Sequence, residues 1–224
     1  MLTALLLLLS AALGADPIHL PVRVHLIAAP DAAVDSARSV GAEELRQRFA
    51  DINRAFAPAG IVWEIESVVV DRPGAEAAYR SAITDRSQRR GALRAMRSAP
   101  HRLGAEGFDL YVLNRLDPVG IGGAYQCAAD EPAGMGAAFV AARTKRGGKL
   151  ATRKWAHELG HALGLQHTSC EAATQDRMMM SGKCEHAARG RVGFTEAEIT
   201  RMRAQAATGH AAPCKGRSKR RSSR

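Results

Sequence analysis

The sequence has no apolar run long enough to span a membrane. Its one strongly apolar segment is the N-terminal MLTALLLLLSAALGAD, where about a dozen apolar residues fall short of the roughly 20 that a spanning helix needs. Small residues at Ala12, Gly14 and Ala15 fit a signal-peptidase site, although no Lys or Arg precedes the apolar core. We therefore expect residues 1–15 to be a signal peptide and the protein to be secreted or periplasmic. A retained membrane anchor is the alternative.

Close cysteine spacings are also absent. The chain has four cysteines, Cys127, Cys170, Cys184 and Cys214, and no C-x-x-C pair among them, which argues against a sulfur-ligated zinc site. In an exported protein an even number of cysteines favours disulfides, and four cysteines allow three pairings. Free thiols are the alternative.

Internal repeats and extremes of composition are missing as well. With 46% hydrophobic and 24% charged residues over 224 positions, the chain is close to the globular average. This excludes overall disorder, collagen, coiled coils and multi-span membrane proteins. The length suits one domain with a substantial core, which we place at residues 16–214.

The net charge of +10 is the one anomaly, and much of it is local. Residues 215–224, KGRSKRRSSR, hold six cations and no acid, which leaves +4 for the rest of the chain. A short basic segment with Ser and Gly cannot bury apolar area, so we expect a disordered tail that could bind an anionic surface. A specific nucleic-acid partner is not required.

Hydrophobic periodicity predicts a mixed α/β fold. Alternating or continuous apolar runs predict strands at 18–28, 61–70, 108–116 and 134–143, and helical spacing predicts helices at 41–57, 86–97, 151–165 and 194–207. Pro58 and Gly60 should end the first helix, and Thr195 with Glu198 matches a capping box at the start of the last one. Strands that alternate with helices in this order favour a mixed sheet.

The predicted helix at 151–165 carries the motif H-E-x-x-H-x-x-G-x-x-H. His157 and His161 lie four residues apart on one helical face, so both imidazoles can bind one zinc ion. Gly164 can adopt the left-handed conformation that ends a helix and redirects the chain, which would bring His167 back as a third nitrogen ligand. Glu158 would lie close to the open coordination position, where a water binds.

A match of this length arises by chance in roughly one such chain in ten thousand. A closed structural zinc site usually has four protein ligands, often including Cys, whereas three His and a carboxylate base describe an open catalytic site. In such a site zinc lowers the pKa of its bound water to about 7. Glu158 would then accept the proton as the hydroxide attacks a peptide carbonyl. The other five histidines belong to no motif, and we expect them to be surface or satisfied core residues.

Through this eleven-residue motif the chain resembles the metzincin zinc metalloproteases. The segment from Asn53 to Phe56, with the turn at Gly60 and Ile61 into a strand, looks most like the pappalysin or matrixin side of the group. The resemblance implies a twisted mixed sheet with two or three long helices and a zinc cleft between an upper and a lower subdomain. It also implies a Met-turn beneath the metal, which DRMMMSG at 176–182 would supply. We favour Met180, because a small polar residue and a Gly follow it, with Met179 as the alternative. Plain core packing of these methionines is a third possibility.

The resemblance further implies an edge strand that binds substrate in extended form, here Gly123, Ala124 and Tyr125, although an ordinary Gly-rich loop is the alternative. A Cys170–Cys184 disulfide would then bracket the Met-turn, and a Cys127–Cys214 disulfide would tie the cleft edge to the C-terminal helix.

The sequence thus predicts a monomeric, secreted endopeptidase with one catalytic Zn²⁺, acting on protein or peptide substrates. The alternative from another class is a zinc-stabilised binding module that docks to an anionic surface through its basic tail. The intact Glu158 favours catalysis.

Overall fold

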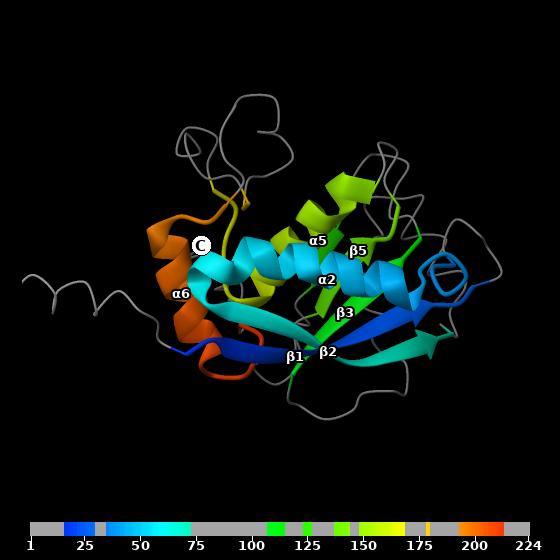
Figure 1. Cartoon of the computed structure of the whole chain (residues 1–224), viewed down its shortest axis with the longest axis horizontal. Coiled ribbons are helices and arrows are strands. Elements are labelled where there is room, and N and C mark those ends of the chain that lie inside the picture. Colours follow the sequence, from blue (N-terminus) through cyan, green and yellow to red (C-terminus); the bar gives the residue numbers. More distant parts are fainter. Residues whose placement is uncertain are drawn as a thin grey trace, which may run out of the picture.

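The computed structural model describes residues 16–29, 35–72, 107–114, 123–126, 137–143, 148–168, 178–179 and 193–212, with 123–126 and 148–151 described by backbone alone. The elements in this part are β1 (Ile18–Ile27), α2 (Ala42–Phe56), the short 3-10 helix η2 (Ala57–Ala59), β2 (Ile61–Asp71), β3 (Phe108–Leu113), β4 (Gly123–Gln126), β5 (Ala137–Ala141), α5 (Gly148–Ala162) and α6 (Glu196–Ala206). Helices α2 and α5 cross the same face of the sheet (Figure 1).

The sheet is mixed, as the sequence predicted. Its strand order is β2-β1-β3-β5-β4, in which β1 pairs with β2 and β3 in parallel, β3 pairs with β5 in parallel, and β4 pairs antiparallel with β5. Helix α2 lies in the connection between the parallel neighbours β1 and β2, as a crossover connection allows. The mixed α/β fold class is therefore confirmed.

The main core lies between the sheet and the helices. Alternate residues of β1 point to this side, and all four are buried: Leu20, Val22, Val24 and Leu26. They pack in one cluster with Phe49, Ile52 and Phe56 of α2 and Trp155 and Leu159 of α5. A period of two on the strand and of about 3.6 on the helices aligns these apolar faces. The packing of β1 against α2 and α5 explains the apolar periodicity of the sequence in the strand and in the helices.

Two side chains hold α5 against the sheet. Trp155 is fully buried, and its Nε1 donates to the carbonyl of Ala141 at the end of β5, 2.9 Å away. Arg48 of α2 lies over the Trp155 ring, with its guanidinium carbon 5.0 Å from the ring centroid, and its Nη2 donates to the carbonyl of Ala142 at 2.9 Å. The helix that carries the histidine motif is thus fixed to the sheet one turn or less from His157.

The turn between α2 and β2 forms where Pro58 and Gly60 predicted a helix end. Pro58 lies in η2, and Gly60 has a φ of +59°, a conformation that favours glycine. The side chain of Asn53 bonds to both backbone groups of Trp63 in β2. Its Oδ1 accepts from the Trp63 N–H at 2.8 Å, and its Nδ2 donates to the Trp63 carbonyl at 3.1 Å.

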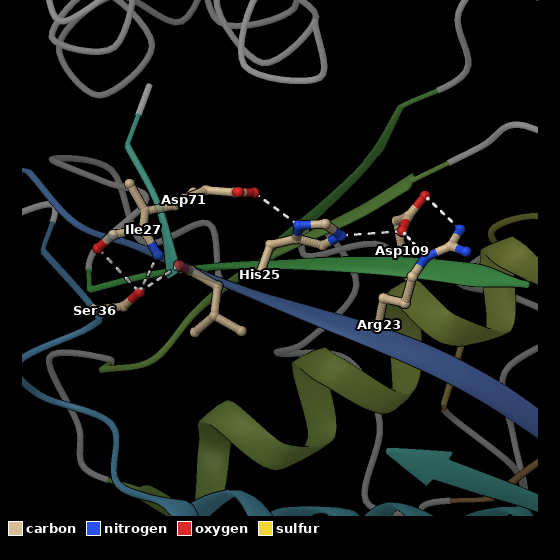
Figure 2. A network of polar contacts seen from close by, with 7 residues as sticks. Arg23, His25, Ile27, Ser36, Asp71 and Asp109 are labelled. Atoms are coloured by element: carbon tan, nitrogen blue, oxygen red, sulfur yellow. Dashed lines mark hydrogen bonds and ion pairs between the residues drawn. The ribbon is translucent and has the colours of Figure 1, made fainter. Parts of the chain in front are cut away.

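The opposite face of the sheet holds a second, smaller apolar cluster that includes Ile27, Tyr111 and Phe139. Beside it runs a line of charged side chains (Figure 2). Arg23 Nε donates to Asp109 at 2.8 Å, and the two ring nitrogens of His25 contact Asp71 at 2.7 Å and Asp109 at 3.0 Å. Three strands, β1, β2 and β3, are therefore linked by ionic contacts as well as by their backbones.

The described element boundaries agree with the sequence prediction to within three residues. The helix predicted at 151–165 is shifted by three residues at both ends, since α5 begins at Gly148 and ends at Ala162. Leu163 and Gly164 form a turn in place of a further helical turn, because Gly164 has a φ of +80°. Four predicted features lie outside the described residues: the signal peptide at 1–15, the helix at 86–97, the cysteines with their proposed disulfides, and the tail at 215–224. None of the described helices is long and apolar enough to cross a membrane.

Candidate metal centre

The three motif histidines come together at the C-terminal end of α5. His157 and His161 lie one turn apart on the helix, and the chain reverses after Ala162. The Gly164 N–H bonds to the His161 carbonyl at 2.9 Å and the Leu165 N–H to the Gly160 carbonyl at 3.1 Å, the pair of bonds that defines a Schellman motif. The chain therefore doubles back and brings His167 beside the other two.

The glycine in this turn is required by its backbone. A left-handed φ of +80° strains any residue with a Cβ, and a Cβ at Gly164 would also lie 3.3 Å from the Cβ of Ala212. Ala212 is held there by a bond from its N–H to the Ala162 carbonyl at 2.7 Å. The C-terminal segment thus packs directly on the turn that returns His167.

The Nε2 atoms of His157, His161 and His167 form a nearly equilateral triangle, with each pair 3.1 Å apart. A tetrahedral zinc ion with Zn–N bonds of about 2.0–2.1 Å holds its ligand nitrogens about 3.3 Å apart. The three nitrogens therefore match the spacing of three corners of a zinc tetrahedron. The fourth corner would be open, because no other His, Cys, Asp or Glu of the described residues completes the group.

Two of the three imidazoles have their tautomer set by a backbone carbonyl. Nδ1 of His157 lies 2.7 Å from the Met178 carbonyl, and Nδ1 of His161 lies 2.8 Å from the Leu165 carbonyl. A carbonyl only accepts, so each Nδ1 must carry a proton. The Nε2 atoms of His157 and His161 then have bare lone pairs that face each other at 3.1 Å. A metal ion between the nitrogens fits this arrangement.

The electrostatics of the cluster keep these rings neutral. Burial and the neighbouring His161 lower the pKa of His157 to about 3, and burial with the charge of His167 lowers the pKa of His161 to about 4. Burial also lowers the pKa of His167, as does Lys154. Neutral imidazole is the form that binds a metal, so no proton has to be displaced at neutral pH.

Glu158 follows the first histidine and is buried, with 5% of its surface exposed. It engages in contacts within the fold. A carboxylate that is shielded from bulk solvent can hold and transfer a proton.

The methionines predicted for the turn beneath the metal lie partly in the described region. Met179 is 1% exposed, and its Sδ would be 2.7 Å from a Cβ added to Gly160, so the thioether packs flat against the helix between His157 and His161. Met178 supplies the carbonyl that orients His157. The favoured residue, Met180, lies outside the described residues, and the role of the alternative, Met179, stays a prediction.

Residues Gly123–Gln126 form β4, which lies beside β5 and is the last of the described strands in the sheet order. The predicted substrate strand, Gly123, Ala124 and Tyr125, therefore has strand backbone, unlike the Gly-rich loop that was its alternative. Contacts between β4 and α5 place this strand next to the helix of the motif.

Sequence reasoning missed the groups that orient the histidines. The Met178 and Leu165 carbonyls are backbone atoms, which leave no residue-type signature. It also missed a contact between Thr168 and Glu198, whose only signal was that Glu198 belongs to a capping box.

Comparisons with known proteins do not identify a family for this chain. No protein-family model matches the chain, and no curated protein matches it. Among solved structures it is similar to metalloproteinase-II from Bacteroides fragilis, with 11% identity, a TM-score of 0.47, and coverage of 87% of this chain and 55% of that one. It is also similar to a chain from a chaperone–substrate complex, with 13% identity, a TM-score of 0.45, and coverage of 88% and 36%. The chain thus spans about half the length of the metalloproteinase, and neither similarity identifies a family.

Proposed function

We propose that this protein is a zinc-dependent endopeptidase of the metzincin type that is exported from the cell. The observation that carries the proposal is the triangle of three Nε2 atoms, 3.1 Å apart, within a motif that also contains a buried glutamate. Structural zinc sites usually have four protein ligands, whereas three histidines leave a coordination position for water or substrate.

Zinc is the metal that the donor set favours. Three imidazole nitrogens at tetrahedral spacing suit Zn²⁺, while oxygen-rich sites suit Mg²⁺ or Ca²⁺. When bound, the ion supplies a Lewis acid that polarises a carbonyl and makes a coordinated water more acidic. His157, His161 and His167 are the proposed ligands.

Glu158 is the proposed general base. It takes a proton from the water that attacks the peptide carbonyl. It then passes this proton to the nitrogen of the scissile bond, so that the amine becomes a good leaving group. Its burial keeps the carboxylate away from competing bulk water, and its position directly after His157 fixes it to the same helical turn as the first ligand.

Strand β4 is the proposed docking edge for the substrate backbone. Among the described strands it is the last in the order of the sheet, so one side of its backbone pairs with β5 and no described strand pairs with the other side. A peptide in extended form can add to such an edge through main-chain hydrogen bonds, which bind many sequences alike. Met179 is the proposed floor of the site, and the signal peptide, the two disulfides and the basic tail complete the proposal for an exported, monomeric enzyme.

The test is metal content and hydrolysis measured on the same purified full chain. We expect one zinc ion per chain and cleavage of casein or a peptide library that a zinc chelator stops and added Zn²⁺ restores. Hydrolysis that ignores the chelator would exclude the mechanism. Zinc binding without hydrolysis of any protein or peptide would favour the zinc-stabilised binding module.

A further inference from the structure

The third histidine differs from the other two in what orients it. His157 and His161 each donate from Nδ1 to a carbonyl, but among the described residues the only polar contacts of His167 are those of its Nε2 with the other two rings. His167 is also the most exposed of the three. Its ring position therefore depends on how firmly its backbone is held.

That backbone is anchored one residue later, at Thr168. The Thr168 N–H donates to the Met179 carbonyl at 3.0 Å, and its hydroxyl donates to Glu198 Oε1 at 3.2 Å. The first bond ties the His167 segment to the same methionine pair that orients His157. The second bond ties it to α6, which is more than 25 residues away in the sequence.

The side chain of Glu198 is also held in place by hydrogen bonds to Thr195. Its Oε2 accepts from the Thr195 backbone N–H at 2.7 Å and from the Thr195 hydroxyl at 3.1 Å, while the Glu198 N–H donates to that hydroxyl. This reciprocal pattern is a capping box, and it uses only one of the two carboxylate oxygens. The other oxygen is left to accept from Thr168.

Helix α6 offers a rigid base for this contact. Met202 and Ala206 are buried in the main core, and Arg203 Nη1 donates to the Ala59 carbonyl at 2.7 Å. Just before the helix, the Gly193 carbonyl accepts from the Met178 N–H at 2.9 Å. The start of α6 thus supports the segments that hold both the first and the third histidine.

We propose that Glu198 is a positioning residue of the metal centre, which acts through Thr168 to hold His167 at the apex of the nitrogen triangle. This inference rests on the proposed metal centre. Partners that orient a metal ligand typically contribute 10- to 100-fold to metal affinity. The capping box, read from the sequence as a device for starting a helix, would then serve the metal site as well.

The experiment measures the zinc dissociation constant of the full chain by competition with a chromophoric chelator, together with the melting temperature of the metal-free protein. Thr168→Val keeps the shape of the side chain and removes only the hydroxyl, so the capping box stays intact. We expect it to weaken zinc binding about 10-fold or more, with little change in the metal-free melting temperature. Thr168→Ser restores the donor and should bind zinc within about two-fold of the native chain.

Thr200→Val is the matched control, because Thr200 lies on α6 with Glu198 and is exposed, and among the described residues its hydroxyl bonds to the carbonyl of Glu196 alone. Its zinc affinity should equal that of the native chain. Glu198→Ala removes the acceptor of the same hydrogen bond and should lower zinc affinity as Thr168→Val does. It should also destabilise α6, because it removes the capping box. The double variant should bind zinc no more weakly than the weaker single variant, because both changes remove one contact.

The inference is overturned if Thr168→Val binds zinc within about two-fold of the native chain, or if Thr200→Val weakens binding equally. These results differ from a failure of the proposed function. In that case the native chain itself binds no zinc, and both proposals fall together. A native chain that binds zinc and cleaves peptides, with a Thr168→Val variant of unchanged affinity, removes only the role of Glu198.

Discussion

Buried histidines occur on both faces of the sheet, and their surroundings drive them to opposite charge states. On the helix side, burial and neighbouring positive groups lower the pKa of His157 to about 3. On the other side, burial again lowers the pKa of His25, but hydrogen bonds to Asp109 and Asp71 outweigh it and raise the value to about 9 (Figure 2). At neutral pH the first is a neutral ring and the second a cation.

The difference shows that burial alone does not set the charge of a histidine. Both side chains are almost completely enclosed, so the loss of hydration is similar in kind. What differs is the partner: a backbone carbonyl leaves one nitrogen bare, whereas a carboxylate on each nitrogen requires two protons. The neutral cluster is ready for a metal ion, while the charged one already contains its own counterions. The histidine cluster is suited to bind a metal ion, and the His25 network is suited to link neighbouring strands.

The largest expected effect is that of replacing Glu158, the carboxylate in the histidine motif. Glu158→Gln removes the proposed proton acceptor and leaves the three histidines in place. We expect peptide hydrolysis to fall about 10²- to 10⁴-fold, because that is the usual contribution of a general base, with zinc content unchanged. Initial rates on a fluorogenic peptide at saturating zinc give the measurement.

Glu64→Gln is the control for that substitution, since Glu64 is exposed and its carboxylate, among the described residues, bonds to the surface residue His19. It should retain the native rate. A Glu158→Gln variant that hydrolyses peptides normally would remove the mechanistic distinction between the two faces.

On the other face, the largest effect should be on stability. His25→Leu removes the cation between Asp71 and Asp109 and leaves two carboxylates without it, one of them fully enclosed. We expect a loss of about 3–5 kcal/mol in the free energy of unfolding, the usual result of removing one member of a buried ion pair. Urea denaturation of the metal-free protein measures it.

His19→Leu is the matched control on the same strand. His19 pairs with Glu64 at the surface, where both side chains are about half exposed, and such pairs contribute little. If the two variants lose equal stability, the ionic contacts behind the sheet have no special role.

Alkaline pH should weaken the same network without any mutation. The pKa of His25 is raised from 6.5 to about 9 in the folded state, so its contribution is complete below pH 6.5 and is lost as the pH rises through 9. The loss should be on the order of 3 kcal/mol. Unfolding free energies of the metal-free protein between pH 6.5 and 9.5 measure it, and in His25→Leu this part of the pH dependence should disappear.

The smallest effect concerns the packing under the metal centre. Gly160→Ala introduces a Cβ 2.7 Å from the Met179 Sδ, so the methionine must shift, at a cost of about 1–3 kcal/mol. Gly41→Ala has open space around the new Cβ and a φ of −87°, so it should cost less than about 1 kcal/mol. Thermal unfolding distinguishes them. Equal melting temperatures would mean that Met179 adapts freely.

Local patterns were sufficient for the elements and for the three histidines. Apolar alternation in 18–28 and helical spacing in 41–57 report burial on one face, which is a property of neighbouring residues. The histidine motif is likewise local, because four residues span one helical turn and a glycine permits the reversal that follows. The capping box of Thr195 and Glu198 was predicted from two positions three residues apart, and it is present in full.

Long-range polar partners could not be predicted in this way. His25 was expected to be only a surface or satisfied core residue, and nothing near it in the sequence points to Asp71 or Asp109, which are 46 and 84 positions away. The end of α5 was placed up to three residues too late, because the hydrophobic spacing continues through Leu163 and Leu165 while the backbone turns at Gly164.

The sequence by itself determined the mixed α/β architecture and the three histidines of one motif, because spacing along a chain dictates which side chains share a helical face or a strand face. Only the tertiary structure decided the state of those side chains: which nitrogen of His157 carries a proton, why His25 is charged, and that Glu198 meets Thr168. Protonation and orientation depend on distances between groups far apart in the chain, and the folded packing of strands and helices sets those distances.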